Sequence, residues 1–121
     1  MDASDIVTGI GAYVGLKELM PRILGPTADY VGTGLKDLTE KGIRNIARVF
    51  SIAEKRLGKS IDKPGQVPPR VFKVILNEAY FCENELAAEY FGGILASSRT
   101  SDARDDRGAY FASMVGRLST Y

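Results

Sequence analysis

The strongest helical signal in the chain is the stretch NELAAEYFGGILAS, residues 84–97. Its hydrophobic residues come in doublets that repeat every four positions, a spacing that fits one face of an α-helix and not the alternation of a strand. Asn84 is the predicted N-cap, because its side chain can accept a hydrogen bond from the first unpaired N–H groups of a helix. We expect the buried face to consist of Leu86, Ala87, Tyr90, Phe91, Ile94 and Leu95.

Two adjacent glycines, Gly92 and Gly93, interrupt this helix. Together they cost about 2 kcal/mol of helix propensity relative to alanine, so the close approach of another backbone is expected to offset them. That approach is either a tight helix crossing within one chain or a contact between subunits, and the sequence leaves both alternatives open. Gly11 and Gly15 have the small-residue spacing that supports the subunit contact.

Two further helices are expected upstream. A weak helix is predicted over residues 1–20, where glycines interrupt the hydrophobic pattern and Pro21 is the expected stop. A long helix is predicted over residues 26–57, because hydrophobic residues follow one another there at three- and four-residue steps. Glycines weaken its first half and leave open a break or kink near residues 32–34. Gly58 supplies its C-terminal stop.

Downstream of the long helix, residues 59–67 are a predicted linker, since they contain the turn-forming run Asp-Lys-Pro-Gly. Residues 68–121 are expected to form a three-helix part, opened by two prolines of the kind favoured in a first helical turn. The chain is thus predicted to be one all-α domain over residues 1–121, a small bundle of four or five helices. The last helix is expected to bury a stripe of Phe111, Met114, Val115 and Leu118.

The composition excludes several classes of function. The chain of 121 residues has no histidine, which removes serine-triad catalysis and most zinc sites. Its single cysteine, Cys82, excludes an intrachain disulfide and lacks a histidine partner for nucleophilic catalysis. The net charge is only +1, and the acidic N-terminus is unlike a secretory signal. We therefore expect a cytoplasmic protein with no membrane span, no catalytic residues and no cofactor.

A basic stripe on the long helix is one candidate site. Residues 36–59 hold seven basic and three acidic residues, a local net charge of +4. The functional interpretation is a surface for nucleic acid or another anion. The alternative is a solvated helix face, which the sequence favours because no aromatic residues are interleaved with the charges. The residues of this stripe are Lys41, Arg44, Arg48, Lys55 and Lys59, of which the first four are the candidate contacts.

A polar loop before the last helix is the second candidate. Its arginines suit a phosphate group and its carboxylates suit magnesium, as in a metal-dependent phosphoryl-transfer enzyme. The alternative is a loop that caps the last helix through Arg–Asp pairs. We favour the alternative and predict no metal site, because adjacent carboxylates diverge on a helix. The residues concerned are Arg99, Asp102, Arg104, Asp105, Asp106 and Arg107.

Several stretches resemble the Abi-alpha (abortive infection alpha) family, a bacterial family of unknown function. They are residues 64–71 (PGQVPPRV), 85–99 (ELAAEYFGGILASSR) and 104–108 (RDDRG), with similarity from residue 24 onward. The glycine pair is the most specific part of this resemblance. The resemblance implies a role in defence against phage and supplies no catalytic residues. Because members of that family are usually longer, it also implies that the chain is the N-terminal portion of a longer architecture, a truncated form or a naturally shortened copy.

These observations lead to two functional hypotheses. The first is a non-enzymatic helical module that works by association, with itself or with a protein partner, in a bacterial abortive-infection system. It depends on the unexplained glycines, on the lack of a catalytic constellation and on the resemblance. The second is a nucleic-acid-binding module that uses the basic stripe.

Overall fold

The computed structural model describes residues 9–25, 39–101 and 107–118. Within these ranges the backbone is helical apart from turns and one isolated bridge between Gln66 and Thr100. The prediction of a small all-α bundle is therefore confirmed. The helices are α2 (Gly9–Leu24), α4 (Glu40–Leu57), the 3₁₀ helix η2 (Gly58–Asp62), α5 (Pro69–Tyr80), α6 (Glu85–Ser97) and α7 (Arg107–Leu118).

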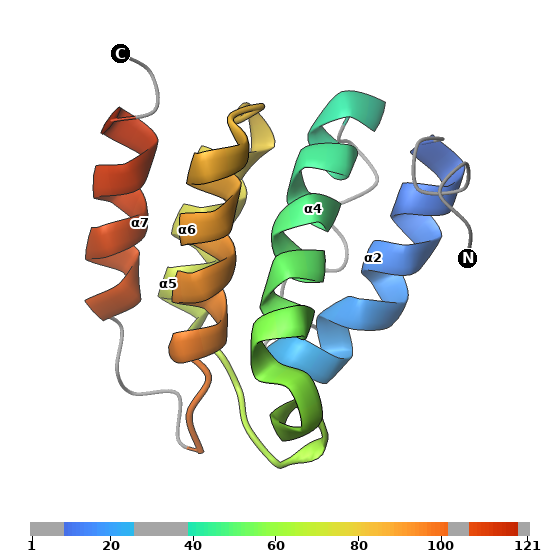
Figure 1. Cartoon of the computed structure of the whole chain (residues 1–121), viewed down its shortest axis with the longest axis vertical. Coiled ribbons are helices and arrows are strands. Elements are labelled where there is room, and N and C mark those ends of the chain that lie inside the picture. Colours follow the sequence, from blue (N-terminus) through green and yellow to red (C-terminus); the bar gives the residue numbers. More distant parts are fainter. Residues whose placement is uncertain (1–8, 26–38, 102–106, 119–121) are drawn as a thin grey trace.

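Figure 1 shows α2, α4, α6 and α7 side by side, with α5 behind α6. Helix α4 packs between α2 and α6, and α7 packs on α5 and α6. The centre is a hydrophobic cluster in which the ring centroids of Phe50 and Phe72 lie 5.7 Å apart, edge to face. Burying such rings stabilises a fold through both transfer from water and ring geometry. The core therefore fixes α4 against α5 and leaves the outer sides of α2, α6 and α7 to solvent.

Helix α2 does not stop at Pro21, and that prediction is wrong. Proline inside a helix removes one hydrogen bond at a cost of about 3 kcal/mol, but the next turn carries Ile23 and Leu24, which are completely buried. Burial of these two side chains offsets the cost, since each contributes roughly 2 kcal/mol. The helix ends instead at Gly25, which has a φ of 65° and donates its N–H to the Pro21 carbonyl.

Helix α4 begins later than the predicted start at residue 26. Thr39 has an extended backbone and caps α4, with its Oγ1 accepting a hydrogen bond from the Gly42 N–H. One helix over 26–57 is therefore wrong, since Thr39 interrupts it. The break left open near residues 32–34 lies within residues 26–38, outside the described part of the chain. The predicted end is confirmed, because Gly58 has a φ of 54° and its N–H bonds to the Glu54 carbonyl. The predicted linker over 59–67 is partly helical, since η2 occupies its first residues.

The start of α4 is tied to the end of α5 through Tyr80. Its hydroxyl donates to Thr39 Oγ1 and accepts from the Thr39 N–H, both at 2.9 Å, and the bond with the side chain contributes most to lowering the pKa of Tyr80. The ring lies on Gly42, where a Cβ would overlap it. Buried Asn45 completes the contact by donating to the Tyr80 carbonyl at 2.9 Å. Glycine at position 42 thus allows α4 and α5 to pack closely.

The cap predicted for α6 is confirmed, and its predicted buried face is wrong in part. Asn84 accepts a hydrogen bond from the Ala87 N–H through its side chain. Leu86 and Tyr90, however, are 65% and 57% exposed, and the buried side instead includes Ala88 and Gly92. The difference arises because α6 turns its small residues toward α4.

Candidate functional site

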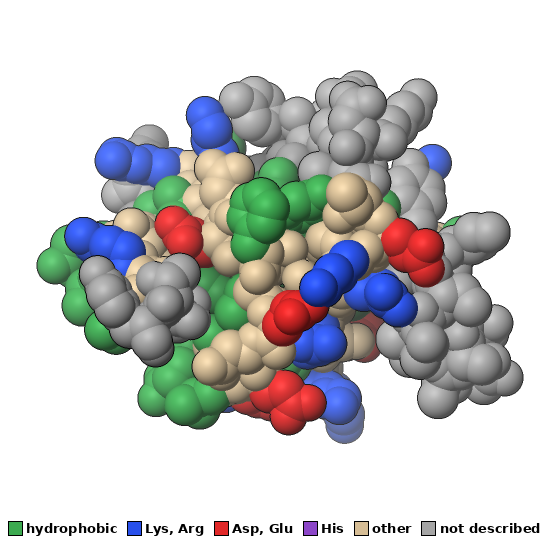
Figure 2. Space-filling view, turned by 90° about the horizontal axis from the view of Figure 1, so that it is seen from above, with side chains coloured by type: hydrophobic (Ala, Val, Ile, Leu, Met, Phe, Trp, Pro, Cys, Tyr) green, Lys and Arg blue, Asp and Glu red, His purple; other side chains and the backbone are tan. Residues whose placement is uncertain are grey.

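A hydrophobic surface formed by α6 and α7 is the most unusual feature of the molecule. Soluble proteins expose single hydrophobic side chains routinely, but rarely a contiguous group of large ones. Figure 2 shows hydrophobic side chains at the left and lower left of the molecule, the side on which α6 and α7 lie. We call this surface the α6–α7 face, and its members are Leu86, Tyr90, Tyr110, Phe111, Met114 and Leu118.

The rotation of α6 about its own axis creates half of this face. A Cβ on Gly92 would lie 2.7 Å from Ile52 Cβ and 3.1 Å from the Val49 carbonyl oxygen. The backbone of α6 therefore packs directly against α4 at this point. With Gly92 turned toward α4, the helical repeat carries Leu86 and Tyr90 to the solvent side. They lie one turn apart and form a continuous ridge.

Helix α7 creates the other half by burying only small residues. Its buried positions are Ala109, Ala112 and Gly116. A Cβ on Gly116 would overlap the Glu78 side chain of α5, which would have to shift to make room for it. The predicted buried stripe of α7 is therefore wrong in part. Val115 packs against the core, but Phe111 is 53% exposed, Met114 36% and Leu118 70%.

The size of the face makes it a candidate binding surface. From the exposed fractions, its six side chains present roughly 600 Å² of accessible area, at the upper end of the largest patches on monomeric proteins. The sequence did carry a signal for it. Six of the ten residues from 86 to 95 belong to the predicted buried face, a wider hydrophobic band than one packed side of a helix requires.

The glycines predicted to mediate packing fall in different places. Gly92 lies in the crossing of α6 over α4 within one chain. The position of a Cβ on Gly93 is 3.5 Å or more from the Arg56 guanidinium, which is an ordinary contact. Gly11 and Gly15 lie in α2, on the opposite side of α4 from α6. The four glycines therefore do not form one surface.

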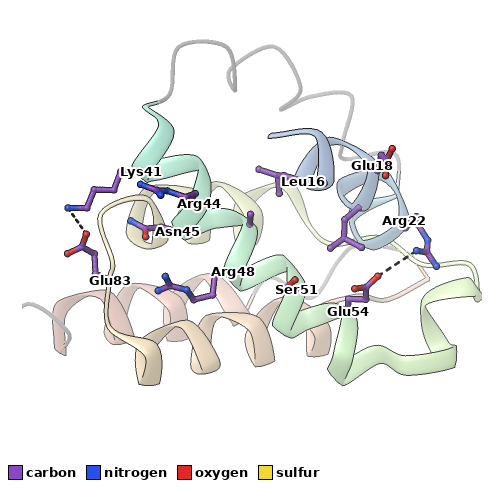
Figure 3. A pocket seen from close by; sticks show the side chains of 13 residues that line it. Leu16, Glu18, Arg22, Lys41, Arg44, Asn45, Arg48, Ser51, Glu54 and Glu83 are labelled. Atoms are coloured by element: carbon purple, nitrogen blue, oxygen red, sulfur yellow. Dashed lines mark ion pairs between the residues drawn. The ribbon is translucent and has the colours of Figure 1, made fainter. Parts of the chain in front are cut away.

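A groove of about 740 Å³ runs between α2 and α4 (Figure 3). It collects three members of the basic stripe, Lys41, Arg44 and Arg48, and adds Arg22 from α2. Lys55, the fourth member, is exposed in the last turn of α4 and does not line the groove. The stripe is thus only partly brought together.

Acidic side chains compensate much of this charge. Arg22 forms ion pairs with Glu54 at 3.6 Å and with Asp62 at 3.5 Å. Lys41 pairs with Glu83, and this contact, helped by the nearby Arg48, holds the pKa of Glu83 below its usual value. The groove lining contains four basic and three acidic side chains, so its charge is mixed rather than strongly positive.

In the polar loop, Arg99 has a structural position. Its guanidinium reaches back to three earlier segments and donates hydrogen bonds at 2.6 to 3.3 Å to backbone carbonyl oxygens. Arg107 begins α7, and the predicted residues Asp102, Arg104, Asp105 and Asp106 lie outside the described part. The described residues contain no group of three acidic or cysteine ligands that would hold a metal. The carbonyl acceptors of Arg99 belong to Arg22, Ile23, Ser60, Ile61 and Lys63.

These features define the class of protein as a small all-α bundle with one exposed hydrophobic face and one groove of mixed charge. Comparison with protein-family models, with curated proteins and with solved structures found no match. The resemblance to the Abi-alpha family stays a prediction. Over residues 9–25, 39–101 and 107–118, none of the helices has the length and apolar composition that a bilayer span requires.

Proposed function

We propose that this chain is a non-enzymatic association module that binds protein through its α6–α7 face. The observation that supports the proposal is the concentration of six large hydrophobic side chains on two adjacent helices. Removing such area from water is the main favourable term in most protein association. The contact of Gly92 with α4 holds α6 in the rotation that exposes Leu86 and Tyr90.

The setting we propose is a bacterial abortive-infection system in the cytoplasm. This part of the proposal depends on the sequence resemblance. An association module fits such a role because assembly can report an infection without chemistry at the module itself. No side chain of this chain is assigned a catalytic part.

The proposed surface is tested by site-specific photo-cross-linking in bacterial cells. A benzophenone amino acid is placed at Tyr90 or at Phe111, and at Val14 as a matched control. Val14 is a hydrophobic residue with 45% exposure, and it lies on α2, away from the face. We expect cross-linked protein adducts at Tyr90 and Phe111 and severalfold less at Val14. Equal yields at the three positions, or none, would contradict the proposal.

The alternative function is nucleic-acid binding in the groove, favoured by the convergence of Lys41, Arg44 and Arg48. The acidic lining opposes it, so we expect no measurable binding to single- or double-stranded oligonucleotides at physiological salt. The measurement is fluorescence anisotropy over a salt series. If binding is found, Arg44→Gln with Arg48→Gln should flatten its salt dependence, while Lys55→Gln, outside the groove, should not. That pattern would establish the alternative.

A further inference from the structure

We propose that the partner of the α6–α7 face is a second copy of this chain, related by a two-fold axis parallel to the helices. In this arrangement α6 of each copy packs on α7 of the other. The proposal rests on the proposed function, because it names the occupant of the same surface. Two observations carry it: the area of the face and the distribution of charge along its two edges.

The area is close to what a stable symmetric dimer requires. A standard protein interface buries about 800 Å² on each partner, and the α6–α7 face offers roughly 600 Å² from its hydrophobic side chains alone. A two-fold interface uses the same surface on both copies, so it closes after two chains and leaves no copy of the α6–α7 face open to a third chain.

The shape of the face suits helices packing on helices. Leu86 and Tyr90 form one ridge along α6, and Phe111 and Leu118 form a second along α7. The two helices are neighbours and run in opposite directions (Figure 1). Two copies packed face to face therefore form a four-helix bundle with two helices from each copy. Every pair of neighbouring helices in it is antiparallel, as in ordinary helical bundles.

A two-fold axis can run parallel to the helices or across them, and the charges along the edges of the α6–α7 face favour one of these two orientations. The edge of α6 is acidic: Glu85 and Glu89 are exposed, and the ion pair of Glu89 with Arg56 places this edge on the α4 side. Exposed basic residues, Arg107 and Arg117, lie near the two ends of α7.

An axis parallel to the helices brings the acidic edge of α6 toward α7 of the other copy. It sets Glu85, at the start of α6, level with Arg117, near the end of α7. An axis across the helices would instead oppose α7 with α7 and bring Arg107 toward Arg117. Like charges placed opposite each other disfavour an interface, so the parallel axis is the one we propose.

The orientation is tested with single cysteines in a Cys82→Ser background, mixed pairwise and oxidised. Leu86→Cys mixed with Leu118→Cys should form a disulfide between chains severalfold faster than either variant alone. Both positions are at least 65% exposed, so the variants should fold, which circular dichroism verifies. Ser97→Cys is the control, because an axis across the helices would place residue 97 of one copy opposite residue 86 of the other. Faster pairing of 86 with 97, or of 86 with itself, would overturn the proposed orientation.

Sedimentation velocity of the unmodified chain tests the stoichiometry. We expect a dimer at tens of micromolar and a monomer for Tyr90→Ser with Phe111→Ser, while Val14→Ser stays dimeric. A monomeric unmodified chain would overturn this inference. If it still gave photo-adducts at Tyr90 with other proteins, the proposed function would stand and only the second copy would be excluded.

Discussion

Replacing Arg99 with methionine should lower the free energy of unfolding by about 3 kcal/mol. The guanidinium donates to five backbone carbonyls, including those of Ile23 and Ile61, whose side chains are buried. Hydrogen bonds from a charged donor contribute about 1.5–3 kcal/mol each, and they do not add fully when one group makes them all. Methionine keeps much of the side-chain length, so the loss reports the hydrogen bonds more than the packing. Urea denaturation followed by circular dichroism measures the change.

Arg99→Lys is the matched control, because it retains the positive charge. The ammonium group is a point donor and lacks the planar fork that spans the carbonyls of Ser60, Ile61 and Lys63 at once. We expect lysine to recover less than half of the loss. If the lysine variant were as stable as the unmodified chain, charge alone would be sufficient. If methionine were harmless, the hydrogen bonds would not stabilise the fold.

The second large effect concerns two neighbouring glycines, whose replacement by alanine should change the free energy of unfolding in opposite directions. Gly92→Ala should destabilise the fold by about 1–2 kcal/mol, the cost of overpacking less the gain in helix propensity. The new Cβ would lie 2.7 Å from Ile52 Cβ, an atom fixed to the backbone that no rotamer change can move away. Helices α4 and α6 would have to separate, and the core side chains beneath them would lose contact.

Gly93→Ala should instead stabilise the fold by about 1 kcal/mol, because its Cβ meets only the flexible end of Arg56 at 3.5 Å. Thermal unfolding of the two variants, measured side by side, gives the comparison. Destabilisation by both would place a second close contact at Gly93, and stabilisation by both would show that the α4–α6 crossing can widen freely.

Local features of the fold were predictable from the sequence where the chemistry is local. The cap at Asn84, the stop at Gly58 and the start of α5 at its two prolines each depend on residues within one turn. The continuation of α2 past Pro21 was not predictable, since it depends on burial of Ile23 by distant segments.

The candidate site was less predictable for a similar reason. Hydrophobic spacing shows that a helix has a wide hydrophobic band, but the side that faces inward is chosen by its neighbours. For α6 the choice follows from the contact of Gly92 with Ile52, and α7 buries only its small residues. The sequence suggested that the glycine pair had a packing purpose. It could not show that this packing would leave Tyr90 and Phe111 at the surface.

The position of Arg99 also has a consequence for how the chain is made. Its carbonyl partners precede it by 36 to 77 positions, and the neighbouring pair of hydrogen bonds between Gln66 and Thr100 spans a similar distance. During synthesis, the end of α2 and all of η2 leave the ribosome well before their donor. Contacts of such long separation are slow to close, so we expect this junction to assemble late. Loss of Arg99 should then speed unfolding more than it slows folding.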